Sequence, residues 1–386
     1  MTAAVPAVLT GIDLPVGTPG GSVELLRDLY LGSAPLIPAD VFMLPAQGAT
    51  PIAGQRRDPR EPVILDVPGK SLEGPEFWTY ANALARALRS AFKGGGHELL
   101  HLQHLTFGAT PALARAFPEL PRMALLHGTD LLFAADHATQ HAVLTETVAT
   151  ADALVAPTAV MFDQLHRITR VTPRRAVHIP WGIPDQLLDT PPLRPSRPDG
   201  PLRVLYAGRL TPEKGGLELF TQLGLLPGIE LSVAAPPDQY ARLASQLDPR
   251  CSARLRCLGW LDRTALWRVF AEHDLLVVPS SRLEAFGLVA VEAQACGLPV
   301  LYREVLGLVE VLGDSALRYG RDEPRRTLPA LVAELRDDPA ALEQLRRAGL
   351  ANAARYRLSE TAKALCSLSE EIQRGRKGLR PTTPES

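Results

Sequence analysis

The stretch RVLYAGRLTPEKGGLELF, residues 203–220, decides the fold of the second half of the chain. It opens with a short apolar run, turns at Gly208, and continues after Gly215 with apolar residues at helical spacing. A strand, a glycine-containing turn and a helix in that order form the unit of a doubly wound α/β sheet. The sequence therefore predicts a parallel sheet, with ligands bound at the carboxyl ends of its strands.

The same alternation of apolar runs and helix-period segments fills the rest of the chain. The runs are VILDV (63–67), HELLHLQHL (97–105), RMALLH (122–127), ALVAP (153–157), ELSVAA (230–235), RLRCLG (254–259), LLVVP (275–279) and PVLY (299–302). A proline-rich segment without sustained periodicity interrupts the alternation and is expected to be a linker. We predict two doubly wound Rossmann-like domains that face each other across a cleft.

The domain boundaries are predicted from that interruption. A chain of 386 residues favours two domains, at roughly 100 to 200 residues each. The predicted parts are an N-terminal domain (1–184), the linker (185–200), a second domain (201–357) and a C-terminal helix with its tail (358–386). We expect this last helix to pack back on the first domain.

Composition excludes several classes of protein. The formal net charge is −1, so the excess of Lys and Arg typical of nucleic-acid binders is absent. The four cysteines show no C-x-x-C spacing, and no disulfide framework is expected. No signal peptide or long uninterrupted apolar run occurs, so a cytoplasmic protein is expected. The oligomeric state stays open.

Two cations stand at the first strand-to-helix junction of the second domain. Arg209 and Lys214 flank the start of a predicted helix, where the helix dipole disfavours positive charge. An anion held between them and the backbone N–H groups, such as a diphosphate, would explain them. A solvated basic turn is an equally good interpretation of the spacing alone.

Two carboxylates follow a later strand in SSRLEAFGLVAVEAQACGLPVL, residues 280–301. Glu284 and Glu292 are spaced by slightly more than two helical turns, so both can face one site. Carboxylates accept hydrogen bonds from the paired hydroxyls of a sugar or a ribose. Taken alone, however, two glutamates at this spacing are most often solvated.

Together the two motifs, G-R-L-x-x-E-K-G and E-x-F-G-L-x-x-x-E-A-x-A-x-G-x-P-V, resemble the GT-B fold glycosyltransferases of family 4. The resemblance covers most of the chain. It implies a retaining transferase that moves a hexose or N-acetylhexosamine from a nucleotide-diphosphate sugar, expected to be UDP-linked, to a hydroxyl of a small soluble acceptor. The first domain is then the acceptor side, and the second binds the donor.

The resemblance also implies a role for each matching residue. Arg209 and Lys214 would bind the phosphates and stabilise the leaving diphosphate. Glu284 would hold the sugar hydroxyls, Glu292 the ribose, and His127 of LLHGTDL the sugar's primary hydroxyl or the reacting centre. The remaining donor-binding positions are Gly20 and Gly21 of a glycine loop, Gly259 and Leu261 against the base, and Phe286, Gly287 and Leu288, whose N–H groups contact the sugar.

The chain departs from the family pattern in three places. The expected P-N-G-x-D segment begins at Pro180 and lacks its Asn and Asp, the paired glycines near Gly307 are reduced to one, and the first domain lacks a G-H-x-V segment. No D-x-D occurs either, which agrees with a metal-independent enzyme. We therefore expect no metal and no cofactor besides the nucleotide-sugar co-substrate.

Four alternatives accompany this interpretation. His97 and His101 match the H-E-x-x-H zinc pattern, but the preceding glycines and the alternation favour a strand. His137 and His141 are spaced so that they could bind a metal ion from one face of a helix, but two histidines at this spacing more often lie on a solvated helix face.

Arg86, Arg89 and Lys93 are basic residues that could meet a membrane surface, but they are too few to predict membrane anchoring, so a lipid acceptor is kept as an alternative. The fold also permits a non-catalytic nucleotide-sugar binding protein. Trp181, Trp260 and Trp267 are interpreted as packing residues.

Overall fold

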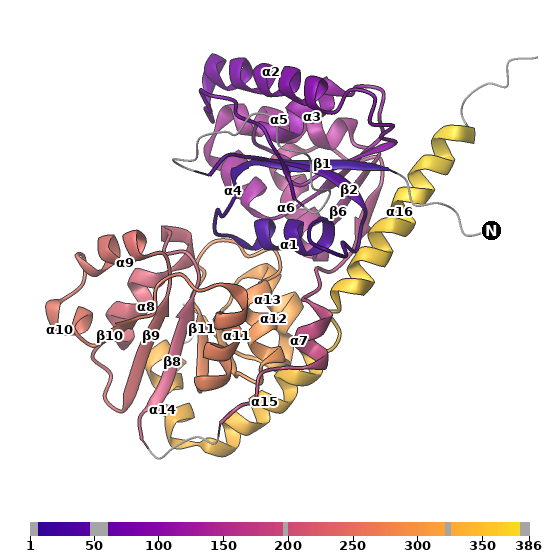
Figure 1. The fold of residues 1–386 in the computed structure, drawn as a ribbon. Coiled ribbons are helices and arrows are strands. Elements are labelled where there is room, and N and C mark those ends of the chain that lie inside the picture. The colour runs from indigo at the N-terminus through magenta and orange to yellow at the C-terminus, as the bar shows by residue number, and fades with distance from the viewer. Residues whose placement is uncertain (1–6, 47–60, 196–199, 321–325, 379–386) are drawn as a thin grey trace, which may run out of the picture. The chain divides into compact units, whose positions relative to one another are not determined.

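The computed structural model describes residues 7–46, 61–195, 200–320 and 326–378 (Figure 1). The chain divides into two compact units, which we describe separately. Unit 1 comprises Met1–Pro180 together with Ser359–Ser386, and unit 2 comprises Trp181–Leu358. The chain therefore enters unit 2 just after Pro180 and leaves it again before its last helix.

Unit 1 is built on a seven-stranded parallel sheet in the order β3-β2-β1-β4-β5-β6-β7. Its strands are β1 (Val8–Pro15), β2 (Ala39–Leu44), β3 (Val63–Ile64), β4 (Leu99–Leu102), β5 (Arg122–Leu125), β6 (Ala153–Ala156) and β7 (Ala176–His178). Its helices are α1 (Gly21–Tyr30), α2 (Gly74–Ala91), α3 (Ala109–Ala116), α4 (Thr129–Asp136), α5 (Ala138–Thr150), α6 (Ala159–Thr169) and α16 (Leu358–Gly378). The apolar runs form strands because helices cover both faces of the sheet, so that most strand side chains are buried and apolar.

Unit 2 contains a six-stranded parallel sheet in the order β10-β9-β8-β11-β12-β13. Its strands are β8 (Leu202–Ala207), β9 (Ile229–Ala234), β10 (Leu255–Cys257), β11 (Leu275–Val278), β12 (Val300–Arg303) and β13 (Leu317–Tyr319). Its helices are α7 (Asp185–Asp189), η1 (Pro212–Lys214), α8 (Gly216–Leu223), α9 (Pro237–Ala244), α10 (Pro249–Ser252), α11 (Arg263–Glu272), α12 (Leu288–Ala295), α13 (Leu306–Leu312), η2 (Gly313–Ser315), α14 (Leu328–Asp337) and α15 (Pro339–Ala353). The strand order reverses between β8 and β11, the place where such sheets bind ligands.

The last helix, α16, packs on unit 1. The Oγ of Ser369 lies 3.0 Å from Nε2 of His101, and the hydroxyl of Thr361 donates to the carbonyl of Pro180 at 2.8 Å. The side chain of Gln373 donates to a carbonyl of the segment that precedes β4. These polar contacts join the end of the chain to a strand in the middle of the first sheet.

The proline-rich segment is part of unit 2 where the structure describes it. It contains α7, and Asp185 and Asp189 of this helix form ion pairs with Arg357 at 3.3 and 2.6 Å. Ile183 pairs with the same residue as an isolated parallel bridge. The place where the chain enters unit 2 is thus tied to the place where it leaves.

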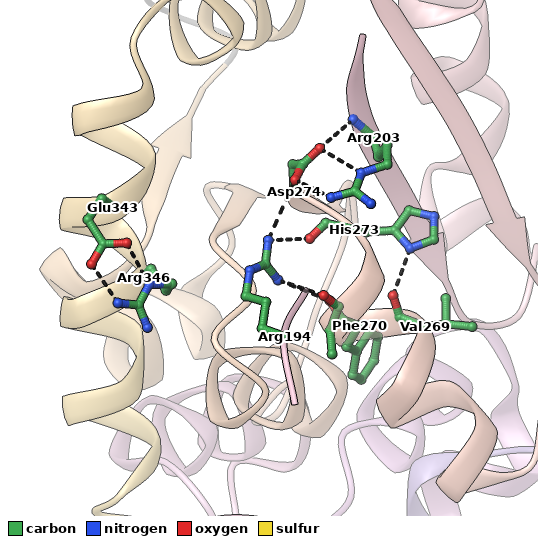
Figure 2. Close-up of polar contacts among 9 residues, drawn as sticks. Arg194, Arg203, Val269, Phe270, His273, Asp274, Glu343 and Arg346 are labelled. Atoms are coloured by element: carbon green, nitrogen blue, oxygen red, sulfur yellow. Dashed lines mark hydrogen bonds and ion pairs between the residues drawn. The ribbon is translucent and has the colours of Figure 1, made fainter. Parts of the chain in front are cut away.

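A partly buried ion-pair cluster lies at the amino ends of the central strands β8 and β11 of unit 2 (Figure 2). Asp274 is 2% exposed and accepts hydrogen bonds from the backbone N–H, Nε and Nη2 of Arg203. Arg194 donates to the carbonyls of Phe270, Ala271 and His273 at the end of α11 and lies 3.6 Å from Asp274. A cation is favourable there because the last carbonyls of a helix have no intrahelical donors.

We expect Asp274→Ala to lower the free energy of unfolding of unit 2 by about 3 kcal/mol, because Arg203 and Arg194 lose their shared carboxylate. Urea unfolding followed by tryptophan fluorescence measures it, since three of the four tryptophans, Trp181, Trp260 and Trp267, lie in unit 2. Asp238→Ala removes an exposed ion pair to Arg242 in the same unit and should cost under about 1 kcal/mol. Equal losses in the two variants would contradict the importance of the cluster.

Candidate functional site

The first part of the site is the turn between β8 and α8. Lys214 ends the short helix η1, and Gly215 follows with a φ of 69°. A Cβ at Gly215 would lie 2.2 Å from the carbonyl oxygen of Pro279, at the end of β11. Only glycine allows both the left-handed backbone and this approach. The turn therefore lies directly against the neighbouring strand end.

That approach brings the two sequence motifs into contact. Nζ of Lys214 lies 2.5 Å from Oε2 of Glu284, and the Oγ of Ser280 donates to the same oxygen at 3.0 Å. The backbone N–H of Ser281 donates to the carbonyl of Glu213 at 2.8 Å. The side chains of Lys214 and Glu284 are 26% and 19% exposed, so a ligand can reach the pair.

The helix α13 supports Glu284 from its backbone side. A Cβ at Gly307 would lie 1.7 Å from the carbonyl oxygen of Glu284. Of the paired glycines that the resemblance implies, this chain keeps the one that this contact requires. The backbone of Glu284 is thereby fixed by packing, while its carboxylate is fixed by Lys214 and Ser280.

The segment Phe286–Leu288 leads into α12, which begins at Leu288 with Gly287 as its N-cap. The ring of Phe286 is 2% exposed and packs edge-to-face on Tyr356 at 5.1 Å. The ring of Phe286 is therefore part of the core and is not available to a ligand. The first N–H groups of α12 have no side-chain cap.

Glu292 lies deeper in α12 and is 5% exposed. Arg263 donates to its Oε1 through Nε at 3.0 Å and through Nη2, and the indole N–H of Trp267 donates to its Oε2 at 3.1 Å. Arg263 belongs to neither sequence motif, so its contact with Glu292 was not predicted. It was also wrong to interpret Trp267 as packing alone, because spacing along α11 does not show what a side chain meets on another helix.

The segment 259–262 precedes α11. Asp262 caps that helix by accepting from the N–H of Ala265 at 2.8 Å. Trp260 is 43% exposed, so its ring is not a core residue as the sequence analysis expected. Leu261 is half-buried, and space around Gly259 is open.

Arg209 stands in the same turn as Lys214. Its carbonyl accepts a hydrogen bond from the hydroxyl of Tyr206 at 2.5 Å, which fixes the backbone at the end of β8. Its guanidinium makes no ion pair with a carboxylate among the described residues, whereas Lys214 does. Of the two cations in this turn, Lys214 is therefore ion-paired, whereas the guanidinium of Arg209 can bind an anionic ligand.

The other predicted residues lie in unit 1. Gly20 is the N-cap of α1 and Gly21 its first residue. His127 follows β5, where Asp130 of α4 accepts its backbone N–H at 2.9 Å and lies 2.6 Å from Nδ1 of His104. Burial, assisted by His104, lowers the pKa of His127 to about 3. His127 is therefore a neutral imidazole near pH 7.

The histidines that the sequence patterns singled out have other partners in the structure. The strand predicted over HELLHLQHL is confirmed by β4, and His101 contacts the Tyr30 hydroxyl through Nδ1 at 2.8 Å and Ser369 through Nε2. His97 pairs with Asp40 at 2.8 Å. His137 caps α5 and pairs with Glu73, so it is not on one continuous helix with His141 as predicted. Among the described residues, no three His, Cys, Asp or Glu side chains gather as a metal site.

Family models match both parts of the chain. Residues 39–187 match the model described as Glycosyltransferase Family 4, and residues 194–350 match Glycosyl transferases group 1. A D-inositol 3-phosphate glycosyltransferase of Catenulispora acidiphila is 30% identical over 82% of this chain and 82% of its own length. The chain belongs to glycosyltransferase family 4. A glycogen synthase of Mycobacterium tuberculosis is also 30% identical, over 72% of this chain and 69% of its own length.

Solved structures confirm the GT-B fold of this family 4 glycosyltransferase. Sucrose-phosphate synthase from Thermosynechococcus elongatus matches 96% of this chain and 100% of its own, with a TM-score of 0.78 and 18% identity. Anabaena HepE in complex with UDP and glucose matches 95% of this chain and 99% of its own, with a TM-score of 0.72 and 18% identity. Within the described residues, no helix combines the length and apolar character needed to cross a bilayer.

We expect Gly307→Ala to displace the backbone of Glu284 and to lower the free energy of unfolding of unit 2 by about 2 kcal/mol, since the added methyl overlaps a carbonyl. Urea unfolding by tryptophan fluorescence and hydrogen exchange over residues 284–287 measure the two effects. Leu306→Ala on the same helix, at a position 48% exposed, is the control and should change little. Unchanged exchange in Gly307→Ala would contradict the role of the contact.

Proposed function

We propose that this enzyme is a retaining glycosyltransferase that moves a hexose or N-acetylhexosamine from a UDP-linked donor to a hydroxyl of a small soluble acceptor, without a metal ion. The observation that carries the proposal is the 2.5 Å ion pair between Lys214 and Glu284. It joins a phosphate-binding cation to a hydroxyl-binding carboxylate. A nucleotide sugar carries both groups in one molecule, a few bonds apart.

In this proposal the turn of unit 2 binds the diphosphate. Arg209 and Lys214 supply positive charge, and the first N–H groups of α8, which no side chain caps, are donors for the same anion. Charge that develops on the leaving diphosphate is then stabilised by groups already in place, which is the largest electrostatic task of the reaction.

Glu284 and Glu292 are assigned to different parts of the donor. Glu284 accepts hydrogen bonds from sugar hydroxyls, and its contact with Lys214 places the sugar next to the phosphates. Glu292 accepts from the ribose, held in orientation by Arg263 and Trp267. His127 contacts the sugar's primary hydroxyl or the reacting centre, and the base lies against residues 259–262.

The proposed chemical step is a front-face displacement. The bond between the anomeric carbon and the phosphate oxygen breaks, and a bond from the acceptor oxygen to that carbon forms on the same face. The departing phosphate takes the acceptor's proton, so no protein nucleophile takes part. The configuration of the anomeric carbon is retained.

The names of related proteins support the donor and acceptor classes. Titles of three Anabaena HepE structures give UDP, UDP with glucose, and UDP-glucose as bound ligands. The relative from Catenulispora is named for inositol 3-phosphate, a small soluble molecule. We extend the UDP-sugar donor and a small acceptor to this chain on that basis.

No observation favours the two alternatives over this proposal. Of the basic residues considered for a membrane surface, Arg89 donates to the carbonyl of Arg115 instead. Liposome co-sedimentation separates a lipid acceptor from a soluble one. Release of free UDP from a UDP-sugar separates an enzyme from a binding protein.

A chelator is expected to leave donor turnover unchanged, because Arg209 and Lys214 supply the charge that a metal ion provides in other transferases. UDP release with and without EDTA tests this. Lost activity that manganese or zinc restores would refute metal independence.

We expect Glu284→Gln and Glu292→Gln to separate the two halves of the donor. Glu284→Gln removes the partner of Lys214, so free UDP should bind as well as before or more tightly, while UDP-sugar turnover falls at least about tenfold. Glu292→Gln should weaken free UDP and UDP-sugar alike, by roughly 1.5 to 3 kcal/mol for a charge-assisted hydrogen bond. Isothermal titration with both ligands measures this.

Glu310→Gln on α13 is the control for the loss of a glutamate charge nearby, and it should leave both affinities within about twofold. Circular dichroism checks the fold of each variant. Equal loss of free UDP binding in Glu284→Gln and Glu292→Gln would disprove the assignment of roles.

A further inference from the structure

A cluster of three titratable side chains lies at the carboxyl ends of β4 and β5 in unit 1. Asp130 is fully buried, and each of its oxygens has a different partner. Oδ1 lies 2.6 Å from Nδ1 of His104, and Oδ2 accepts the backbone N–H of His127 at 2.9 Å. The hydroxyl of Thr106 also donates to Oδ1 at 3.4 Å. One carboxylate thus links the segment after β4 to the segment after β5.

We propose that His104 is a positioning residue, which acts through Asp130 to fix the backbone and the ring of His127. This inference rests on the proposed function, in which His127 contacts the donor sugar. It adds to that function a residue for which neither the motifs nor the family models assign a role.

Asp130 is a buried carboxylate whose charge depends on its partners. A buried carboxylate without a cation is costly, and burial by itself would raise its pKa. The charge and hydrogen bond of His104 nevertheless lower the pKa of Asp130 below its ordinary value. His104 therefore keeps Asp130 ionised, and an ionised carboxylate binds the N–H of His127 more strongly than a neutral acid does.

The rings are also in contact. The ring centroids of His104 and His127 lie 4.9 Å apart at 50°. His104 in turn packs edge-to-face on Phe107 at 5.2 Å, and the N–H of Phe107 donates to the buried Gln140 at 2.8 Å. The ring of His104 is thus fixed by its contacts with Asp130 and Phe107, and this fixed ring packs on the ring of His127.

The pair also acts on the pKa of His127. Among the described residues, His104 lowers this pKa and Asp130 raises it. Their effects oppose each other, and burial keeps the imidazole neutral. His127 then offers the sugar a neutral hydrogen-bonding group of fixed orientation. It carries no positive charge that would compete with Arg209 and Lys214 for the leaving phosphate.

The test uses His104→Asn, since an Asn amide can still donate to Asp130 while the imidazole and its ring contact with His127 are removed. We expect the pKa of His127 to rise, because the effect of His104 that lowers it is removed while the Asn amide still donates to Asp130. Histidine ring NMR of the full-length protein measures it, with His127→Gln to assign the signal. UDP release from UDP-glucose should fall roughly 10- to 100-fold in kcat, with KM within about threefold.

His97→Asn is the matched control, because His97 pairs with Asp40 at 2.8 Å in the same unit and should leave both readouts unchanged. Asp130→Asn is the second variant, and its effect on kcat should not add to that of His104→Asn, as both remove one contact. A His127 titration identical in wild type and His104→Asn would overturn the inference. A wild-type protein that releases no UDP would refute the proposed function instead, while the NMR measurement would still decide the role of His104.

Discussion

The candidate donor site depends on two places where a glycine backbone lies against a carbonyl of another strand-to-helix junction. Gly215 lies against Pro279, and Gly307 lies against Glu284. Three junctions, after β8, β11 and β12, are thereby packed at backbone distance. A larger residue at either position would overlap the facing carbonyl oxygen and push the junctions apart. The ion pair between Lys214 and Glu284 is a consequence of this packing.

Buried carboxylates elsewhere in the molecule are likewise fixed by a neighbouring group. Asp274, Glu292 and Asp130 are buried, and each has a cation or an imidazole within hydrogen-bond distance. Such pairs fix orientation, because a buried charge that loses its partner is costly. The pair of Lys214 and Glu284 is more exposed than those of Asp274 and Glu292, as expected of a pair that must open for a ligand.

Some parts of the site were predictable from residue types and others were not. The strand at β4 was predicted, because glycines and alternating leucines exclude a helix there. The single helix predicted through His137 and His141 was wrong, because α4 and α5 are separate helices and the break at His137 has no proline or glycine to mark it. Arg263 and Trp267 were missed, because their partner Glu292 lies more than 20 residues away on another helix.

The sequence by itself determined the two parallel sheets and the residue types at their carboxyl ends. Local signals suffice for this, since apolar runs, turn glycines and helical periods are set within a few residues. Only the tertiary structure decided which of those residues meet. Whether Lys214 reaches Glu284, or His104 reaches Asp130, depends on how loops from neighbouring strands pack. Sequence spacing carries no information on such a contact, because the residues involved are joined through the sheet and not along the chain.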